Sequence, residues 1–195
     1  VVPSLSLDKE ELQKLKGVRH YEERLLFLLI LLSLPKTRVI FVTSEPIHPH
    51  IIDYYLQLLP GIPFSHARRR LEMFAAHDSS NKSLSQKILD RPALMRRIRK
   101  AIGNAKNTHL TVFNVTPVEK RLSVALDIPL LGPDPKHLHH GSKSGSRKLF
   151  RQAGVPMPFG FEDLKGADDI FDATVELWKR DPGLKKAVIK INEGF

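Results

Sequence analysis

Residues 37–59 have the sequence TRVIFVTSEPIHPHIIDYYLQLL, and this stretch decides the fold class. Segment 37–43 is short, rich in β-branched residues and flanked by turn formers, which is typical of a buried parallel strand. Segment 49–59 follows it with an apolar stripe at helical spacing, formed by Ile51, Ile52, Tyr55, Leu58 and Leu59. A strand followed directly by such a helix is the repeating unit of an α/β protein.

The same alternation continues on both sides of this stretch. Strands are predicted at 1–5, 71–76, 109–115 and 128–131, and helices at 20–34, 84–102 and 118–126, with a break near Pro92. We therefore expect a doubly wound α/β domain with a parallel sheet. Helix 20–34 is apolar almost all round, so we expect it to be central.

The composition changes at residues 132–143, GPDPKHLHHGSK, where prolines, glycines and histidines cluster without periodicity. Such a stretch indicates a linker or domain boundary. Beyond it the sequence predicts a helix at 145–153, an extended stretch at 155–161, a helix at 167–180 and a strand at 186–192. Since the chain starts at Val1 and stops just after a predicted strand, we expect a fragment of a longer protein.

The bulk composition excludes several classes of protein. The chain has no cysteine, which excludes disulfides, thiolate metal sites and cysteine nucleophiles and fits a reducing, cytoplasmic setting. The longest apolar run, 25–34, is too short to span a bilayer, so no membrane partner is expected. The formal net charge is +10, and a cationic surface attracts phosphates.

Two arginine clusters carry much of this charge, HARRRLE at 66–72 and MRRIRK at 95–100. They suit nucleic-acid phosphates or a carboxylate-rich substrate, and a solvated basic helix face is the plainer interpretation. Phe74 is the sole aromatic residue between positions 65 and 106, which argues against a platform for stacking single-stranded bases.

Histidines and hydroxyls mark two further candidate sites. His137, His139 and His140 could include metal ligands, but no carboxylate or cysteine lies at useful spacing, and a surface turn is favoured. The second set, Thr43, Ser44, Glu45 and His48, follows the predicted strand 37–43. Ligands bind at the carboxyl ends of parallel strands, so these residues predict a substrate site or, equally, a loop with a capped helix start.

Residues 141–158, GSKSGSRKLFRQAGVPMP, combine glycines, hydroxyls and cations. A P-loop requires a second glycine where this stretch has Ser146 or Phe150, and the dinucleotide fingerprint is missing as well. Two lysines on separate elements, Lys143 and Lys190, could instead converge on one polyphosphate.

The pattern SK…RKLFRQAGVPMP followed by AVIKINEG resembles the start of the ATP-grasp fold. Upstream, HYEERLLFLLILL, residues 37–63 and HLTVFNVTPVEKRLSVALDIPLLGPDP resemble the pre-ATP-grasp domain of the pheganomycin-type peptide ligase group. The resemblance implies a Rossmann-like pre-ATP-grasp domain at 1–140 and an incomplete ATP-grasp domain at 141–195. It also implies that Lys143 and Lys190 contact ATP and that a glycine-rich lid begins at Gly194.

The resemblance further implies a reaction, in which ATP phosphorylates a carboxylate and an amine attacks the acyl phosphate to give an amide. Mg²⁺ would bridge the phosphates, with its ligands beyond Phe195, so no catalytic residue or metal ligand is assigned and the fragment alone is expected to be inactive. Two alternatives stay open: a non-catalytic ATP-grasp-like protein-interaction module, since a eukaryotic IQ-motif protein has a similar domain, and a basic nucleic-acid-binding domain.

Overall fold

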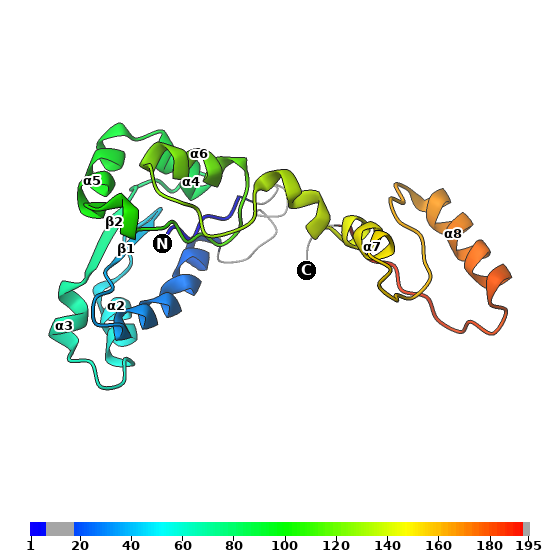
Figure 1. Ribbon diagram of the computed structural model, residues 1–195, viewed down its shortest axis with the longest axis horizontal. Coiled ribbons are helices and arrows are strands. Elements are labelled where there is room, and N and C mark those ends of the chain that lie inside the picture. The colour runs from blue at the N-terminus through cyan, green and yellow to red at the C-terminus, as the bar shows by residue number, and fades with distance from the viewer. Residues whose placement is uncertain (7–17, 193–195) are drawn as a thin grey trace. The chain divides into compact units, whose positions relative to one another are not determined.

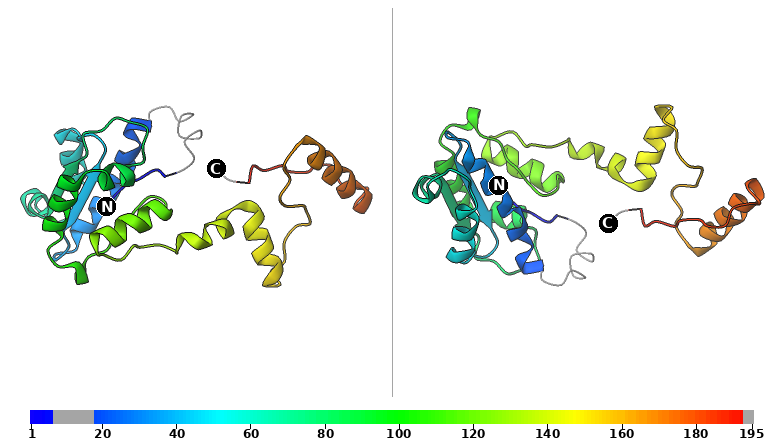
Figure 2. Two further views of the ribbon diagram at one scale, coloured as in Figure 1. Left: turned by 90° about the horizontal axis from the view of Figure 1, so that it is seen from above. Right: turned by 90° about the horizontal axis from the view of Figure 1, so that it is seen from below.

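The computed structural model describes residues 1–6 and 18–192. The chain divides into two units, Val1–Pro135 and Lys136–Phe195 (Figure 1, Figure 2). Both units combine helices with extended chain, and the first contains a small parallel sheet, consistent with the predicted α/β class. None of the described helices is both long enough and apolar enough to cross a membrane.

The sheet of the first unit is centred on β1 (Val39–Thr43) and β2 (Leu71–Ala75). The two strands are parallel, and their register places Val39 opposite Leu71 and Thr43 opposite Ala75. Both segments are rich in β-branched or large apolar residues, which pack well on a pleated surface. The strands predicted at 37–43 and 71–76 are therefore confirmed.

The remaining predicted strands of the first unit appear as short bridges. Val1 exchanges main-chain hydrogen bonds with Ile40 and Val42 of β1, and single parallel bridges join Val2 to Val112 and Leu110 to Leu130. Across the sheet the segments therefore follow the order β2, β1, residues 1–2, residues 110–112 and residue 130. The β1–β2 pair and both bridges are parallel, as the sequence predicts.

Helices connect these segments. They are the 3₁₀ helix η1 (Val18–Ser33), α2 (Pro49–Gln57), α3 (Phe64–Arg69), α4 (Leu84–Leu89), α5 (Pro92–Ile102), the 3₁₀ turn η2 (Ala105–Asn107) and α6 (Pro117–Leu126). The predicted break near Pro92 is confirmed, because this proline begins α5. Helix α3 was not predicted, since its six residues FSHARR are too short and too basic to show an apolar stripe.

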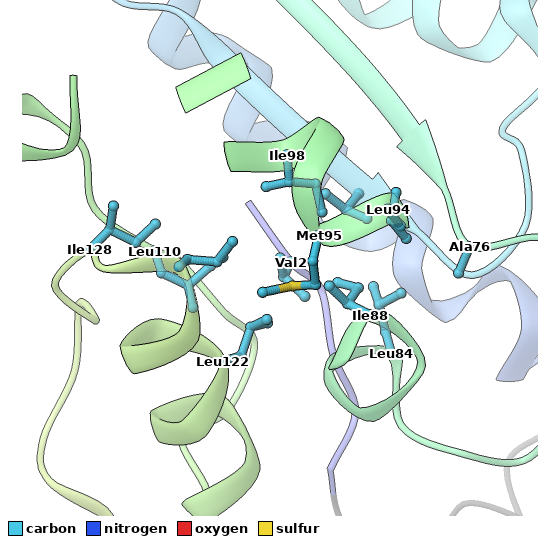
Figure 3. Close-up of a cluster of buried hydrophobic side chains, with 12 residues drawn as sticks. Val2, Ala76, Leu84, Ile88, Leu94, Met95, Ile98, Leu110, Leu122 and Ile128 are labelled. Atoms are coloured by element: carbon cyan, nitrogen blue, oxygen red, sulfur yellow. The ribbon is translucent and has the colours of Figure 1, made fainter. Parts of the chain in front are cut away.

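Two hydrophobic clusters cover the two faces of the sheet, because alternate side chains of a strand point to opposite faces. Phe41 packs with η1, α2 and α3, whereas Val42 packs with α4, α5 and α6. Figure 3 shows the second cluster, in which Leu84, Ile88, Met95, Ile98 and Leu122 converge around Val2. The first unit is thus a three-layered arrangement of helices, sheet and helices.

Helix η1 differs from its predicted central position. Its buried side chains are Leu25, Leu26, Leu29 and Leu32, whereas Phe27 is 56% exposed and Ile30 is 59% exposed. One face of η1 packs on α2 and β1, and the other carries apolar residues to the surface. The prediction that it is central was wrong, because an apolar circumference does not determine which side meets the core.

The second unit contains the 3₁₀ helix η3 (Pro135–Gly141), which begins at the boundary, α7 (Lys143–Gln152) and α8 (Ala167–Arg180). No residue between positions 129 and 192 is buried. Segment 186–192 does not form the predicted strand, and Val188 is 80% exposed. A strand needs a neighbouring strand for its main-chain hydrogen bonds, and no described residue supplies one here.

We expect Gly145→Ala to disrupt the start of α7. A Cβ atom at this position would overlap the main-chain oxygen of His139. That oxygen accepts hydrogen bonds from the main chain and hydroxyl of Ser142, the N-cap of α7. Hydrogen exchange should show that the free energy of opening of the α7 amides is lower by about 1–3 kcal/mol, which is the usual cost of overpacking.

Gly141→Ala is the matched control, because a Cβ atom at Gly141 would meet nothing within 4 Å. Equal effects of the two substitutions on exchange in α7 would show that the close approach of His139 does not constrain the helix start.

Candidate functional site

Two places where polar groups gather in the described residues correspond to sites predicted from the sequence. One lies at the carboxyl ends of β1 and β2 in the first unit, where the sequence predicts a substrate site. The other lies at the start of α7 in the second unit, near one of the two predicted ATP-binding lysines.

A polar network follows β1 at Ser44. The Ser44 hydroxyl donates to Glu22 Oε1 at 2.6 Å, and its main-chain N–H donates to Glu22 Oε2 at 2.5 Å. Lys87 Nζ donates to the same hydroxyl at 2.9 Å. Glu22 comes from η1 and Lys87 from α4, so the network joins helices on opposite faces of the sheet.

Asp78, three residues beyond β2, extends this network. Lys87 Nζ donates to the Asp78 main-chain oxygen at 2.8 Å, and the Asp78 main-chain N–H donates to the Ser44 oxygen at 3.1 Å. The Asp78 carboxylate accepts hydrogen bonds from Ser80 N at 2.8 Å and from the Arg91 guanidinium at 2.7 Å. The loops after β1 and β2 are therefore tied together.

Burial sets the electrostatics of the network. It raises the pKa of Glu22, against the opposing effect of the two hydrogen bonds from Ser44. Burial also lowers the pKa of Lys87, which is only 4% exposed, while the negative charges of Glu22 and Asp78 oppose that shift. Because Ser44 is 8% exposed and its hydroxyl is engaged on both sides, the network positions loops and does not present a nucleophile.

Stability in acid should depend on Asp78. Hydrogen bonds from Ser80, followed by the contact with Arg91, lower its pKa from 3.8 to about 2. Between these values the native state binds fewer protons than the unfolded state, so stability is lost as the pH falls through this window. Urea denaturation at a series of pH values should give a flatter profile for Asp78→Asn than for the wild type.

Asp53→Asn on α2 is the control for removal of a carboxylate elsewhere in the first unit. A profile for Asp78→Asn that parallels the wild type across this window would contradict the assigned role of Asp78.

The four residues predicted to line a substrate site differ in their burial and in their hydrogen bonds. Thr43 is buried, and its hydroxyl donates to the main-chain oxygen of Glu45 at 2.7 Å. Ser44 belongs to the polar network, and Glu45 is exposed. His48 is the N-cap of α2, where its side chain accepts a hydrogen bond from His50 N. The plainer interpretation, a loop with a capped helix start, therefore describes His48.

A cleft of about 220 Å³ lies beside these residues at the carboxyl ends of β1 and β2. Its lining residues come from both strands, the loops that follow them, α2 and α5: Thr43, Pro46, Ile47, Ile52, Met73, Phe74, Ala75, His77 and Arg97. The Arg97 guanidinium lies 5.0 Å from the centre of the Phe74 ring. Of the four predicted site residues, Thr43 alone lines this cleft.

A second polar cluster lies where residues 1–6 leave the sheet. Ser4, fully buried, contacts the Ser6 hydroxyl at 3.0 Å and accepts a hydrogen bond from Ser85 N at 3.1 Å. The Ser6 hydroxyl donates to Glu119, which also closes a capping box with Thr116 at the start of α6. Sequence reasoning missed this convergence because its members are far apart in the chain.

The arginine clusters are partly accounted for by main-chain contacts. Arg70 donates to the oxygens of Leu32, Leu34 and Thr37 at 2.6 to 3.0 Å, where η1 ends and leads into β1. Arg99 donates to the oxygen of Ala125 near the end of α6. These two guanidinium groups terminate helices, which the alternatives considered from the sequence did not include.

The three clustered histidines lie on η3. The rings of His139 and His140 are 3.8 Å apart, and those of His137 and His140 are 5.7 Å apart and stacked. Burial, followed by the charges of His139 and His137, lowers the pKa of His140. In the described part of the chain, no group of three or more histidine, aspartate or glutamate side chains is arranged to hold a metal ion.

Hydrogen bonds join the two segments that carry Lys143 and Lys190. Lys143 is the first residue of α7, and its main-chain N–H donates to the Asn192 oxygen at 3.1 Å. Ser144 N donates to Asn192 Oδ1 at 2.9 Å. Lys190 is exposed and lies two residues before Asn192. Gly194, where the lid was predicted to begin, lies outside the described residues.

The basic side chains that follow on α7 are engaged in ion pairs. Arg147 and Arg151 both contact Glu162, at 2.7 and 2.8 Å, and Lys148 pairs with Asp163. Burial opposes ionisation of Glu162, but the two arginines outweigh it and lower its pKa. These pairs hold the loop at 158–163 against α7.

Comparison with known proteins gives two similarities. The chain is 25% identical over 193 residues to L-propargylglycine–L-glutamate ligase of Streptantibioticus cattleyicolor, in an alignment that covers 93% of this chain and 39% of that enzyme. It is 26% identical over 209 residues to IQ motif-containing protein H of Danio rerio, covering 98% of this chain and 20% of that protein. The chain thus spans well under half the length of either relative. No family model and no solved structure matches it.

Proposed function

We propose that the chain is the first part of an ATP-dependent carboxylate–amine ligase of the ATP-grasp type. The observation that carries the proposal is its similarity, over 93% of its length, to a ligase. Residues 1–140 would form the pre-ATP-grasp domain and residues 141–195 the beginning of the nucleotide-binding domain. A cytoplasmic location belongs to the same proposal.

The order of the sheet supports the Rossmann-like part of this proposal. Numbered along the chain, its segments are 1–2, β1, β2, 110–112 and 130, and across the sheet they follow the order third, second, first, fourth, fifth. Doubly wound nucleotide-binding folds have this order, with the ligand crevice at the carboxyl ends of the strands, where the order reverses. The Ser44 network and the cluster at Ser6 and Glu119 lie at that end.

In the proposed ATP site, side chains and not main-chain N–H groups contact the phosphates. The first main-chain N–H groups of α7 are already engaged, Lys143 and Ser144 with Asn192, and Gly145 with the Ser142 hydroxyl. The helix start therefore does not offer the free N–H groups that bind anions elsewhere. The ammonium groups of Lys143 and Lys190 are the proposed ATP contacts, with Gly194 beginning the lid.

The proposed reaction proceeds in two steps. A substrate carboxylate oxygen attacks the γ-phosphorus and ADP leaves, after which an amine nitrogen attacks the acyl carbon and inorganic phosphate leaves. Lysine ammonium groups would neutralise phosphate charge as it shifts. Mg²⁺, when bound, would supply further neutralisation of phosphate charge, and we assign none of the described residues as its ligands.

The test is ADP release by the full-length protein with Mg-ATP across a panel of amino acids and short peptides. Release that requires both an acid and an amine is the expected result. A protein that neither binds ATP nor releases ADP with any pair would overturn the ligase proposal.

A second candidate function is a non-catalytic protein-interaction module. The similarity to IQ motif-containing protein H, which covers 98% of this chain, favours it. The ADP-release assay separates the two, because the module would retain partner binding without nucleotide turnover. Tight, salt-sensitive binding of DNA or RNA without an effect of ATP would instead favour the nucleic-acid-binding alternative.

A further inference from the structure

The cleft beside β2 crosses the edge of the sheet. Met73 and Ile52 belong to the hydrophobic cluster on one face, whereas Phe74 packs against the cluster on the other, and Arg97 comes from α5 on that second face. All four line the same cleft. β2 pairs with β1 alone among the described strands, so it is the edge strand (Figure 1). The cleft therefore includes the open edge of β2.

Some main-chain N–H and C=O groups of β2 point outward at this open edge. Val39 N donates to the Arg70 oxygen and Ala76 N donates to the Thr43 oxygen, so the even-numbered residues of β2 bond to β1. In a parallel pair the alternate residues face the other way, which directs the N–H and C=O groups of Met73 and Ala75 outward. An edge of this kind accepts an added strand.

The side chains of the cleft define which strand would fit. Ile47, Ile52, Met73 and Phe74 make it apolar, Arg97 and His77 supply cationic or hydrogen-bonding groups, and no acidic residue lines it. Its volume of about 220 Å³ is smaller than the roughly 300–1,000 Å³ of pockets that enclose whole small ligands. It suits one or two side chains of a ligand whose remainder lies along the strand edge.

We propose that the edge of β2 binds an extended peptide segment, which adds a strand beside Met73 and Ala75, places an apolar side chain in the cleft and pairs a carboxylate with Arg97. The carboxylate is either the peptide's own C-terminus or an acidic side chain. A second copy of this chain is a poorer occupant, because pairing two β2 edges brings their cationic rims together. The proposal is independent of the roles of Lys143 and Lys190.

The experiment is a titration of the ¹⁵N-labelled chain with acetyl-Val-Thr-Val-Leu carrying a free carboxyl terminus. Three further peptides complete the set: its C-terminal amide, the amide with glutamate as the penultimate residue, and the peptide with alternate amides N-methylated. The amides of Met73, Ala75 and His77 should shift, whereas the amide of Phe74, which faces β1, should shift less. N-methylation should abolish binding, and the glutamate peptide shows which carboxylate is preferred.

Two substitutions and one control substitution test the residues of the proposed site. Arg97→Ala should weaken binding of the free-acid peptide about tenfold or more, the usual effect of losing a charge-assisted hydrogen bond. Arg96→Ala should leave binding unchanged, because Arg96 is also an exposed cation of α5 but does not line the cleft. Ala75→Pro removes an outward N–H without touching the bonds to β1 and should also weaken binding.

Three results would overturn the proposal. They are the absence of shifts along β2 with every peptide, equal losses for Arg96→Ala and Arg97→Ala, and undiminished binding of the N-methylated peptide. Without peptide, each variant should give a spectrum that matches that of the wild type away from the substituted residue. Such a match shows that a loss of binding is not a loss of folding.

Discussion

Lys87→Met is expected to lower the free energy of unfolding by about 3 kcal/mol, because it leaves two buried acceptors without their donor and the Glu22 charge without a nearby cation. Lys87 is 4% exposed and donates to the Ser44 hydroxyl and to the Asp78 main-chain oxygen. Methionine keeps most of the side-chain volume but neither donates a hydrogen bond nor carries charge. The Glu22 carboxylate, two hydrogen bonds from Lys87 through Ser44, then loses its compensating cation. Urea denaturation at neutral pH measures the effect.

Lys82→Met is the matched control. Lys82 pairs with Asp90 at 2.8 Å, but its side chain is 57% exposed, and surface pairs of this kind contribute about 0–1 kcal/mol. Similar effects of the two substitutions would show that the buried network does not stabilise the fold.

The double variant Glu22→Gln/Lys87→Met separates charge from packing. Glutamine retains a hydrogen-bond acceptor for Ser44 but removes the uncompensated charge, so the double variant should be destabilised by less than the sum of the single variants. Strict additivity would mean that Glu22 and Lys87 act on stability independently and that Ser44 does not couple them.

Much of the fold of the first unit could be predicted because its signals are local. The β-branched run at 37–43, the proline at position 92 and the apolar stripe of α2 each specify an element without reference to the rest of the chain. Segment 186–192 carries equally strong strand propensity, yet it is not a strand in the structure. Its local signal was correct for extended chain, but pairing depends on neighbours that the described residues do not provide.

The candidate site was harder to predict, because its contacts join distant parts of the chain. Lys87 lies on a short helix among other polar residues and has the sequence signature of a solvated cation, whereas its partner Ser44 is 43 positions away. Arg70 likewise has the appearance of a surface cation until the fold brings the end of η1 to it. Periodicity shows which residues share a face, but it does not show which polar groups meet across elements.

Lys143→Ala and Lys190→Ala are each expected to reduce acid- and amine-dependent ADP release by the full-length protein about tenfold or more. Each substitution would remove one charge-assisted contact to phosphate, which contributes about 1.5–3 kcal/mol. The segments of the two lysines are already joined by the hydrogen bonds from Lys143 and Ser144 to Asn192. Both variants should also bind ATP more weakly in equilibrium measurements.

Lys186→Ala and Lys148→Ala are the controls, because each lies on the same segment as one of the two lysines. Lys148 pairs with Asp163, and Lys186 precedes Lys190 by four positions. If the controls reduce ADP release as much as Lys143→Ala and Lys190→Ala do, the general positive charge of the unit attracts ATP and the two-lysine site is wrong. If only one lysine variant loses activity, that lysine alone contacts phosphate, and the bonds to Asn192 serve the fold of the unit instead of its site.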